Sequence, residues 1–278
     1  MSSRIDAPGV KDVIGVKQAM RHPADGRLHF SELKAHAECP RMVVHACSEA
    51  RDLTRAMLVG GITDSLVFAS GRGHALYPGP RRAGKEWDEF KVANPGKYLC
   101  IQSELDEAVG AAQAVLAHPV ARDLLDGAEF QRVARWEAYG LPCASGIAGE
   151  RGGFDAIHLS HKRRRPFIAD LKTTVDTEPR AFSRHAESML WHAQGRWFLD
   201  GAHALDIDVH DFYLIGVRSK PPHIVTVLQV PARALDIGGM MITKWTERHK
   251  ACEAAGEWPE YVQDVTEMTL RDDVLFDE

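Results

Sequence analysis

The chain has 278 residues, of which 45% are hydrophobic and 26% charged, so it is long enough for one elaborated globular domain or two small ones. It contains no apolar run of about 18 residues, and its first residues lack an apolar signal core, so neither a membrane span nor secretion is indicated and we expect a cytoplasmic protein. A net charge of −5 argues against a uniformly basic coat for nucleic acid but is compatible with a local basic groove.

The N-terminal half is expected to be mainly helical. Ser31 is placed to cap a helix, and Pro40 lies where that helix should stop or restart. The pair Gly60 and Gly61 indicates either close backbone packing or a helix start near Thr63.

Most of the loop signals lie in residues 71–103, where we expect an irregular excursion with a short helix around 86–92. One strong helix should follow over residues 103–125, with Ser103 as its N-cap and acidic residues in its first turn, where they complement the helix dipole.

Short apolar stretches replace helical spacing over residues 130–175 and predict three antiparallel strands joined by turns, in FQRVARWEAYG, CASGIAGERGGFDAIHLS and FIADLKTT. A long helix over about 180–205, two strands in DFYLIGVRS and HIVTVLQV, and a final helix over about 231–255 should follow. This order predicts an α/β or α+β fold, in which a small mixed sheet is flanked by helices and preceded by a helical N-terminal half.

The strand FIADLKTT places Asp170 and Lys172 on the same face, about 6–7 Å apart along the strand. On its own this spacing is equally typical of an edge-strand ion pair. Asp155 precedes Asp170 by fifteen residues, however, and a hairpin of that length brings the two strands side by side. Two carboxylates in one patch need a compensating cation, which predicts Mg²⁺ or Mn²⁺ held by oxygen ligands, with Lys172 stabilising a developing charge.

Asp155, the triplet Asp170-Leu171-Lys172 and Gln194 on the following helix together resemble the motif of the PD-(D/E)xK nuclease superfamily. Within it, the chain is similar to the RecE-like exodeoxyribonucleases of phages and prophages, whose nuclease domain is RecB-like. Segments that resemble this branch extend over most of the chain: SELKAHAECP, RRAGKEWDEF, ELDEAVGAAQAVLAHPVARDLL, ADLKTTVD and WPEY.

The resemblance implies a single nuclease domain over residues 1–278 with a core like that of restriction endonucleases. Its helical N-terminal part would cover about 25–128, its catalytic sheet and helix core about 129–258, and a flexible tail 265–278.

The same resemblance implies a role for each motif residue. Asp155 and Asp170 would bind the metal, and the Leu171 carbonyl would be a further ligand. Lys172 and Gln194 would complete the catalytic set.

Two positions depart from the family pattern. Phe198 stands where the family commonly has Tyr, four residues beyond Gln194, so ring packing beside the glutamine is retained but no phenolic hydroxyl is present. Asp64, in GGITDSLVF, stands where the family typically has a histidine ligand. We expect Asp64 to bind the metal, because a carboxylate suits Mg²⁺; the alternative is a helix N-terminal acid without a catalytic role.

Further residues are candidates for contact with the site or with DNA. Glu137, on the strand before that of Asp155, is expected either to line the site or to face solvent. Trp191 and Trp197 should be core residues, like Phe198, because their spacing forms an apolar face. Two basic clusters could hold DNA phosphates, unless they are simply solvated: Arg81, Arg82 and Lys85, and the turn residues Lys162, Arg163, Arg164 and Arg165.

The five cysteines form no C-x-x-C pair and indicate reduced thiols. Cys39 occupies the position of a cluster ligand in some RecB-like nucleases, but near the C-terminus the chain has only Cys252. Because an iron–sulfur cluster needs four thiolates, none is expected.

The resemblance implies a Mg²⁺-dependent deoxyribonuclease, with Mn²⁺ as a substitute ion. The leading expectation is a 5′-to-3′ exonuclease that acts on linear double-stranded DNA and leaves 3′ single strands in phage-type recombination. Its implied partners are double-stranded DNA, a RecT-like annealing protein and further copies of the chain in a trimeric or tetrameric ring, with no membrane. Two alternatives stay open: a catalytically impaired DNA-binding or assembly module of the same fold, and an endonuclease of the superfamily.

Overall fold

The computed structural model describes residues 22, 25–48, 53–69, 72–79, 81–147, 153–262 and 264–268. At its centre is a five-stranded mixed sheet. The order of its strands is β10 (Val225–Gln229), β9 (Asp211–Arg218), β8 (Phe167–Thr174), β7 (Phe154–His158) and β4 (Glu129–Arg132). The central strand β8 runs parallel to β9 and antiparallel to β7, so the sheet is mixed at the strand that carries the predicted motif.

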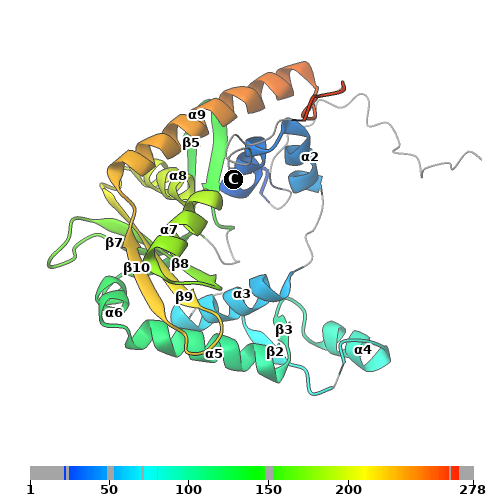
Figure 1. The fold of residues 1–278 in the computed structure, drawn as a ribbon, viewed down its shortest axis with the longest axis vertical. Helices are drawn as coiled ribbons and strands as arrows, with labels where there is room; N and C mark the ends of the chain where they lie inside the picture. The colour runs from blue at the N-terminus through cyan, green and yellow to red at the C-terminus, as the bar shows by residue number, and fades with distance from the viewer. Residues whose placement is uncertain are drawn as a thin grey trace, which may run out of the picture.

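Helices cover both faces of this sheet (Figure 1). Consecutive residues of β8 enter different cores, because side chains alternate along a strand: Ile168 packs in one, and Phe167 and Ala169 in the other. The first core is completed by α7 (Pro179–Ser188), α8 (Trp191–His203) and α9 (Ala232–Ala255). The second is completed by α3 (Arg55–Val67), α5 (Gln102–Ala117) and α6 (Pro119–Leu125). This arrangement confirms the predicted α/β class, with helices flanking a small mixed sheet.

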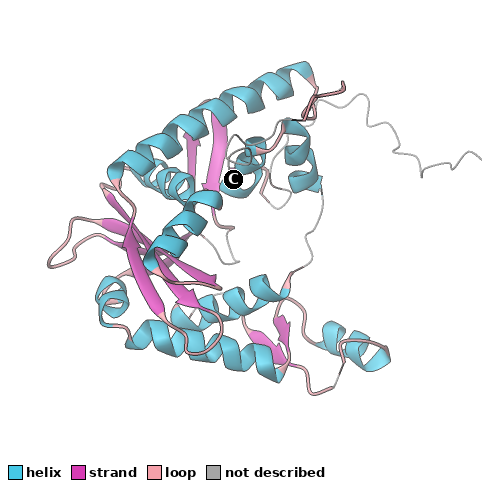
Figure 2. Ribbon diagram, viewed as in Figure 1, coloured by secondary structure: helices cyan, strands magenta, loops and turns pink. Residues whose placement is uncertain are grey.

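Two smaller sheets lie outside the central one (Figure 2). The first has the order β1 (Leu28–His29), β6 (Leu141–Ser145) and β5 (Ala134–Ala138), and the second pairs β2 (His74–Leu76) with β3 (Tyr98–Cys100). The remaining elements are α1 (Phe30–Leu33), the 3-10 helix Lys34–Ala37, α2 (Pro40–Ser48) and α4 (Lys85–Ala93). None of the helices in the described ranges combines the length and hydropathy needed to cross a membrane.

The prediction of three strands over residues 130–175 is wrong in its first two members. Each of them is two strands that belong to different sheets, β4 and β5 in one case and β6 and β7 in the other. The break between β4 and β5 lies beside Gly153, whose φ is +103°. A Cβ on this residue would lie 2.3 Å from the Arg132 carbonyl oxygen. Residues 148–152 of the second segment lie outside the described residues.

Two long helices of the prediction are also each divided in the structure. The helix expected over 180–205 breaks at Leu190, which adopts a left-handed φ of +62° before α8 begins. The helix expected from Ser103 breaks between α5 and α6 at Pro119, which has no amide hydrogen to continue the α-helical bonds. Ser103 lies inside α5 instead of capping it, and the Glu104 carboxylate accepts the Ile101 amide at 3.0 Å in its place.

Two N-terminal expectations can be compared with the structure. Ser31 lies within α1 and is not its N-cap, whereas Pro40 begins α2, as a restart requires. A helix start near Thr63 is wrong, because α3 begins at Arg55. Close packing at Gly60 is confirmed: a Cβ there would lie 2.8 Å from the Thr173 hydroxyl oxygen, so α3 approaches β8 closely at this point.

The C-terminal elements follow the prediction more closely. The final helix α9 agrees with the expected range within one residue, and it ends at Gly256, whose φ of +73° is the left-handed conformation that favours glycine. Of the expected tail at 265–278, residues 269–278 lie outside the described residues.

Candidate active site

Two carboxylates meet across the β7–β8 ladder. The register pairs Ala156 with Ala169, and its continuation places Asp155 opposite Asp170, as the hairpin spacing predicted. Both side chains lie on the face covered by α8, the face to which Ile157 and Ile168 also point. They line a cavity of about 280 Å³ together with Asp64, Lys172 and Gln194, among other residues.

Lys172 is held within this cavity by three contacts. Its ammonium lies 2.6 Å from the Asp170 carboxylate, donates a hydrogen bond of 3.0 Å to the Gln194 amide oxygen and lies 5.4 Å from the centre of the Trp191 ring. Gln194 lies in the first turn of α8, which begins after the left-handed Leu190, and the Leu190 carbonyl accepts the backbone N–H of Gln194 at 3.0 Å. The glutamine therefore positions the lysine.

Asp64 reaches the site from α3 and is linked to Asp155 through a residue that the sequence did not indicate. The Gln131 amide nitrogen donates to Asp64 at 2.9 Å and to Asp155 at 3.3 Å. The second oxygen of Asp155 accepts the Leu171 backbone amide at 2.9 Å. Asp64, Asp155 and strand β8 thus form one connected polar network.

Gln131 points to the carboxylates because of an irregularity in β4. The ladder pairs Phe130 with Ala156 and Arg132 with Phe154, and Gln131 between them has a left-handed φ of +52°. This conformation is uncommon for a residue other than glycine, and strain of this kind is concentrated at functional sites. A single glutamine in a segment predicted to be one continuous strand does not indicate a left-handed backbone or a contact with the carboxylates. Gln131 could have been identified as a site residue only if the strand break had been known.

The carboxylates are electrostatically crowded. The pKa of Asp155 is raised well above its ordinary value, first by burial and then by the charges of Asp170 and Asp64, which together outweigh Lys172 and the Leu171 amide. One oxygen of Asp170 is buried without a hydrogen bond and has only the ion pair with Lys172. Such a site is suited to a hard divalent cation.

The residues present fit that cation, with one condition. Asp155, Asp170 and the Leu171 carbonyl offer oxygen ligands at the end of one hairpin, as Mg²⁺ prefers. The Gln131 amide, however, lies between Asp64 and Asp155. Asp64 can therefore share an ion with Asp155 only if this amide swings away or turns its oxygen toward the ion.

The aromatic residues of α8 are core residues, as expected. Phe198 is 5% exposed, and its ring packs against Phe154 at 5.5 Å and Phe212 at 6.2 Å between centroids. Trp197 is fully buried and donates its indole hydrogen to the Ala144 carbonyl. Both residues also line the cavity, where Phe198 contributes an apolar ring and no hydroxyl group.

Of the two alternatives for Glu137, the structure supports the one in which it faces solvent. Glu137 belongs to β5 in the separate three-stranded sheet, and its side chain is 70% exposed. It lies 3.3 Å from the Arg27 guanidinium at the surface. The place beside Asp155 that was expected for Glu137 is taken by Gln131, because β4 and not β5 pairs with β7.

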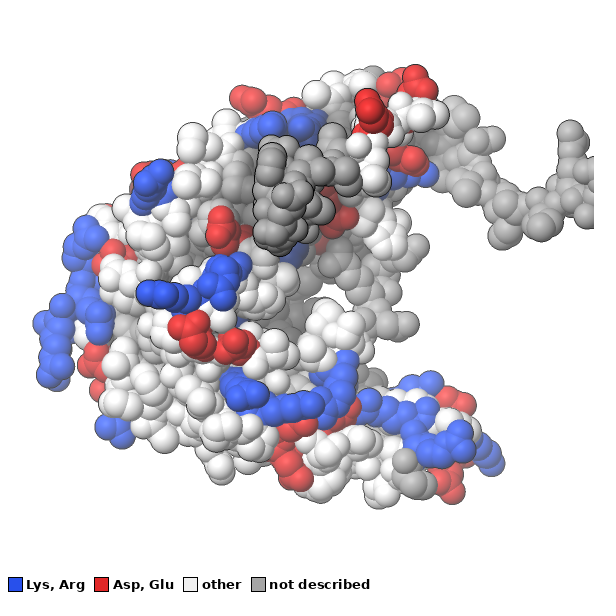
Figure 3. Space-filling view, viewed as in Figure 1, with Lys and Arg blue, Asp and Glu red and all other residues white. Residues whose placement is uncertain are grey.

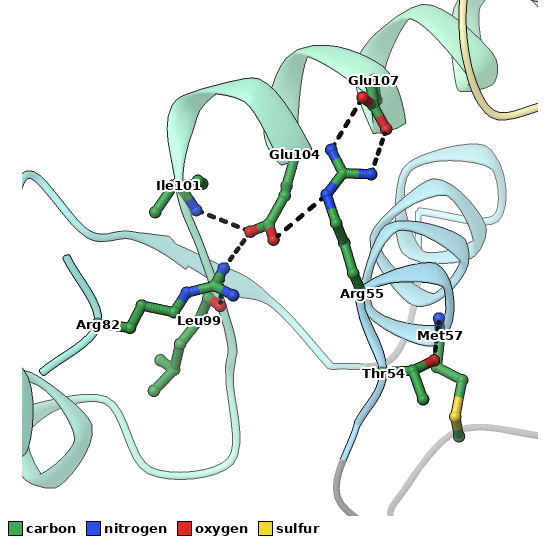
Figure 4. A network of polar contacts seen from close by, with 8 residues as sticks. All are labelled: Thr54, Arg55, Met57, Arg82, Leu99, Ile101, Glu104 and Glu107. Carbon is green, nitrogen blue, oxygen red and sulfur yellow. Dashed lines mark hydrogen bonds and ion pairs between the residues drawn. The ribbon is translucent and has the colours of Figure 1, made fainter. Parts of the chain in front are cut away.

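The first basic cluster is divided between structure and solvent. The Arg82 guanidinium is paired with the buried Glu104 carboxylate and donates to the Leu99 carbonyl at 3.2 Å, so it anchors the excursion to α5 (Figure 4). Arg55 completes the network with two hydrogen bonds, of 2.8 and 3.0 Å, to Glu107. Arg81 and Lys85 are exposed, which leaves them accessible to DNA.

The second basic cluster lies at the far end of the hairpin from the carboxylates. The turn follows the pair His158 and Phe167, whereas Asp155 and Asp170 lie at the other end of the ladder. Arg164 is 3.7 Å from the Asp123 carboxylate, and Arg165 is 2.8 Å from that of Asp211. Lys162 and Arg163 are exposed. The structure does not bring the four turn residues Lys162, Arg163, Arg164 and Arg165 to the cavity.

Comparisons with known proteins agree with this architecture. The model of a family described as "PDDEXK-like domain of unknown function (DUF3799)" matches residues 29–269. A crystal structure of a candidate exonuclease from Eubacterium rectale is similar with a TM-score of 0.58 and 15% sequence identity, over 90% of this chain and 93% of that one. At this identity the likeness concerns the fold alone. No curated protein sequence matches the chain.

Proposed function

The chain belongs to the PDDEXK-like family DUF3799, and from that premise we propose that it is a metal-dependent deoxyribonuclease. The observation that carries the proposal is the meeting of Asp155, Asp170 and Lys172 in one cavity, with the lysine oriented by Gln194. A structural ion pair would need no second carboxylate opposite Asp170 and no glutamine to hold the lysine. The whole chain would act as a single nuclease domain.

The proposed division of labour follows from the contacts. Asp155, Asp170 and the Leu171 carbonyl would hold a divalent ion, with Asp64 joining once the Gln131 amide turns. Bound there, Mg²⁺ or Mn²⁺ would lower the pKa of a water molecule and neutralise charge on the phosphate. Lys172, fixed 3.0 Å from the Gln194 oxygen, would lie beside the attacked phosphate and stabilise the negative charge that develops on it. The aromatic wall of Trp197 and Phe198 would exclude bulk water.

DNA is the proposed substrate class, and the distribution of charge supports it. The space-filling view is hollowed between the two helical layers, and Lys and Arg side chains gather along the lower of the two rims (Figure 3). Exposed cations of that layer include Arg81 and Lys85. A chain with a net charge of −5 that carries cations along one groove suits a polyanion held in that groove.

The finer proposal rests on the resemblance to RecE-like enzymes. It is a 5′-to-3′ exonuclease that digests linear duplex DNA in phage-type recombination and passes 3′ single strands to a RecT-like annealing protein. Several copies of the chain would close a ring around the DNA. A ring explains why an acidic chain with only local cations would hold its substrate.

The test is digestion of matched DNA substrates by purified protein with Mg²⁺. Linear duplex should be degraded and covalently closed circles spared, and Asp170→Ala should abolish activity while the circular dichroism spectrum is retained. Cleavage of closed circles would replace the exonuclease with an endonuclease. Absence of cleavage with either Mg²⁺ or Mn²⁺ would refute the nuclease and favour the impaired DNA-binding module, to which the Gln131 amide between Asp64 and Asp155 also points.

A further inference from the structure

We propose that His22, Asp25 and His29 form a second metal site, for a borderline divalent ion such as Zn²⁺, distinct from the carboxylate centre. Each residue offers one ligand atom, and all of these atoms lie within 4.8 Å of one another. Among the described residues, no other group of three or more His, Cys, Asp or Glu side chains brings its ligand atoms within that distance. The proposal does not depend on the nuclease activity.

The geometry of the three residues is that of a compact ligand set. The His29 Nε2 atom lies 3.1 Å from each oxygen of Asp25, and the rings of His22 and His29 are 4.7 Å apart between centroids. Neighbouring ligand atoms of tetrahedral zinc lie about 3.3 Å apart, given Zn–N distances of about 2.0–2.1 Å. The separation of His29 and Asp25 is close to this spacing, and the ligand atom of His22 lies within 4.8 Å of both, so a movement of His22 would complete the set around an ion.

Burial and local structure support a built site. The side chains of Asp25 and His29 are only 7% and 10% exposed. Asp25 is oriented by the Arg27 amide, which donates to its Oδ1 at 3.1 Å, and His29 is fixed in β1, paired with Ala144 of β6. Two of the three ligands are therefore held in place before any ion binds.

The chemistry of the ligands separates this site from the carboxylate centre. Two imidazoles and one carboxylate suit Zn²⁺ and other borderline ions, whereas an all-oxygen centre suits Mg²⁺. Three protein ligands would leave a fourth position for water. An ion here would tie His22 to the wall of the catalytic cavity, because His29, Phe30 and Ser31 all line that cavity.

Zinc titration of the untagged, metal-free protein tests the proposal, with isothermal calorimetry in excess Mg²⁺ and thermal melting as the readouts. We expect one Zn²⁺ per chain that Mg²⁺ does not displace, and a higher melting temperature in its presence. His22→Ala and Asp25→Asn should each weaken Zn²⁺ binding at least tenfold and remove the thermal shift. Asp170→Asn should leave this binding unchanged, because it alters only the carboxylate centre.

The matched control is His210→Ala, since His210 forms an exposed pair with Asp208 at 3.2 Å. It should bind Zn²⁺ as the wild type does. His22→Ala is the primary variant because His22 is less buried than His29, and Asp25→Asn decides the matter if His22→Ala does not fold. Absence of Zn²⁺ binding by the wild type would overturn the proposal in favour of a metal-free His–Asp hydrogen bond. Binding that survives both variants, or that is lost in Asp170→Asn, would overturn it equally.

Discussion

Asp64→Asn is expected to stabilise the metal-free protein while weakening its binding of Mg²⁺. The substitution keeps the shape of the side chain and an oxygen that can accept the Gln131 hydrogen bond, but it removes one of the charges that raise the pKa of Asp155. The expected change is therefore electrostatic.

The magnitude follows from the spacing of the two carboxylates. The two hydrogen bonds of Gln131, of 2.9 and 3.3 Å, place the bonded oxygens of Asp64 and Asp155 no more than about 6 Å apart. At an effective dielectric constant of about 20, two unit charges at that distance repel by about 3 kcal/mol. Both residues line a cavity that water can enter, so solvent screening reduces this, and we expect a gain of about 1–2 kcal/mol.

The sign depends on pH. Because the folded-state pKa of Asp155 is raised, the protein loses stability as pH rises through that pKa, and the loss is absent at pH values below the ordinary carboxyl pKa. Asp64→Asn should lower the raised pKa and flatten this decline. Its advantage should grow as pH rises above the pKa that Asp155 has in the variant, and it should be absent at about pH 3, below the ordinary pKa of Asp.

Urea unfolding in EDTA at several pH values measures the effect, and the exposed acid variant Asp106→Asn is the control. In Mg²⁺ the order should reverse, because the wild type gains more from the ion than the variant does. If Asp64→Asn lowers the free energy of unfolding in EDTA, or matches the control at every pH tested, then Asp64 and Asp155 are not coupled and the reasoning is refuted.

Three further outcomes are expected. Gln194→Ala should lower kcat about tenfold or more with little change in KM, because Lys172 loses the 3.0 Å bond that orients it; equal loss in both parameters would indicate a role in DNA binding instead. Gly60→Ala should destabilise the protein by about 1–3 kcal/mol in urea unfolding through its clash with the Thr173 hydroxyl, and Thr173→Ala should restore most of that loss; no rescue would mean that the helix, not this contact, is disturbed. Light scattering should show a trimer or tetramer, and a monomer at all concentrations would contradict the ring.

Much of the β7–β8 hairpin could be predicted from the sequence. The apolar run FIADLKTT is strand β8 with the predicted ends, and the alternation of side chains alone puts Asp170 and Lys172 on one face. The fifteen-residue spacing to Asp155 was sufficient to predict a hairpin, and the observed register places these carboxylates opposite each other. Local periodicity and short-range pairing determine these features, so a single sequence contains them.

Which residues surround that hairpin was decided only by tertiary structure. The segment that reads as one strand before Asp155 divides between two sheets, and this division brings Gln131 to the carboxylates and leaves Glu137 at the surface. The left-handed backbone of Gln131 and the similar turn at Leu190 carry no local sequence signal, because neither residue is one that favours positive φ. Long-range packing holds these conformations against local preference, and a pattern within one segment does not record what the rest of the chain imposes on it.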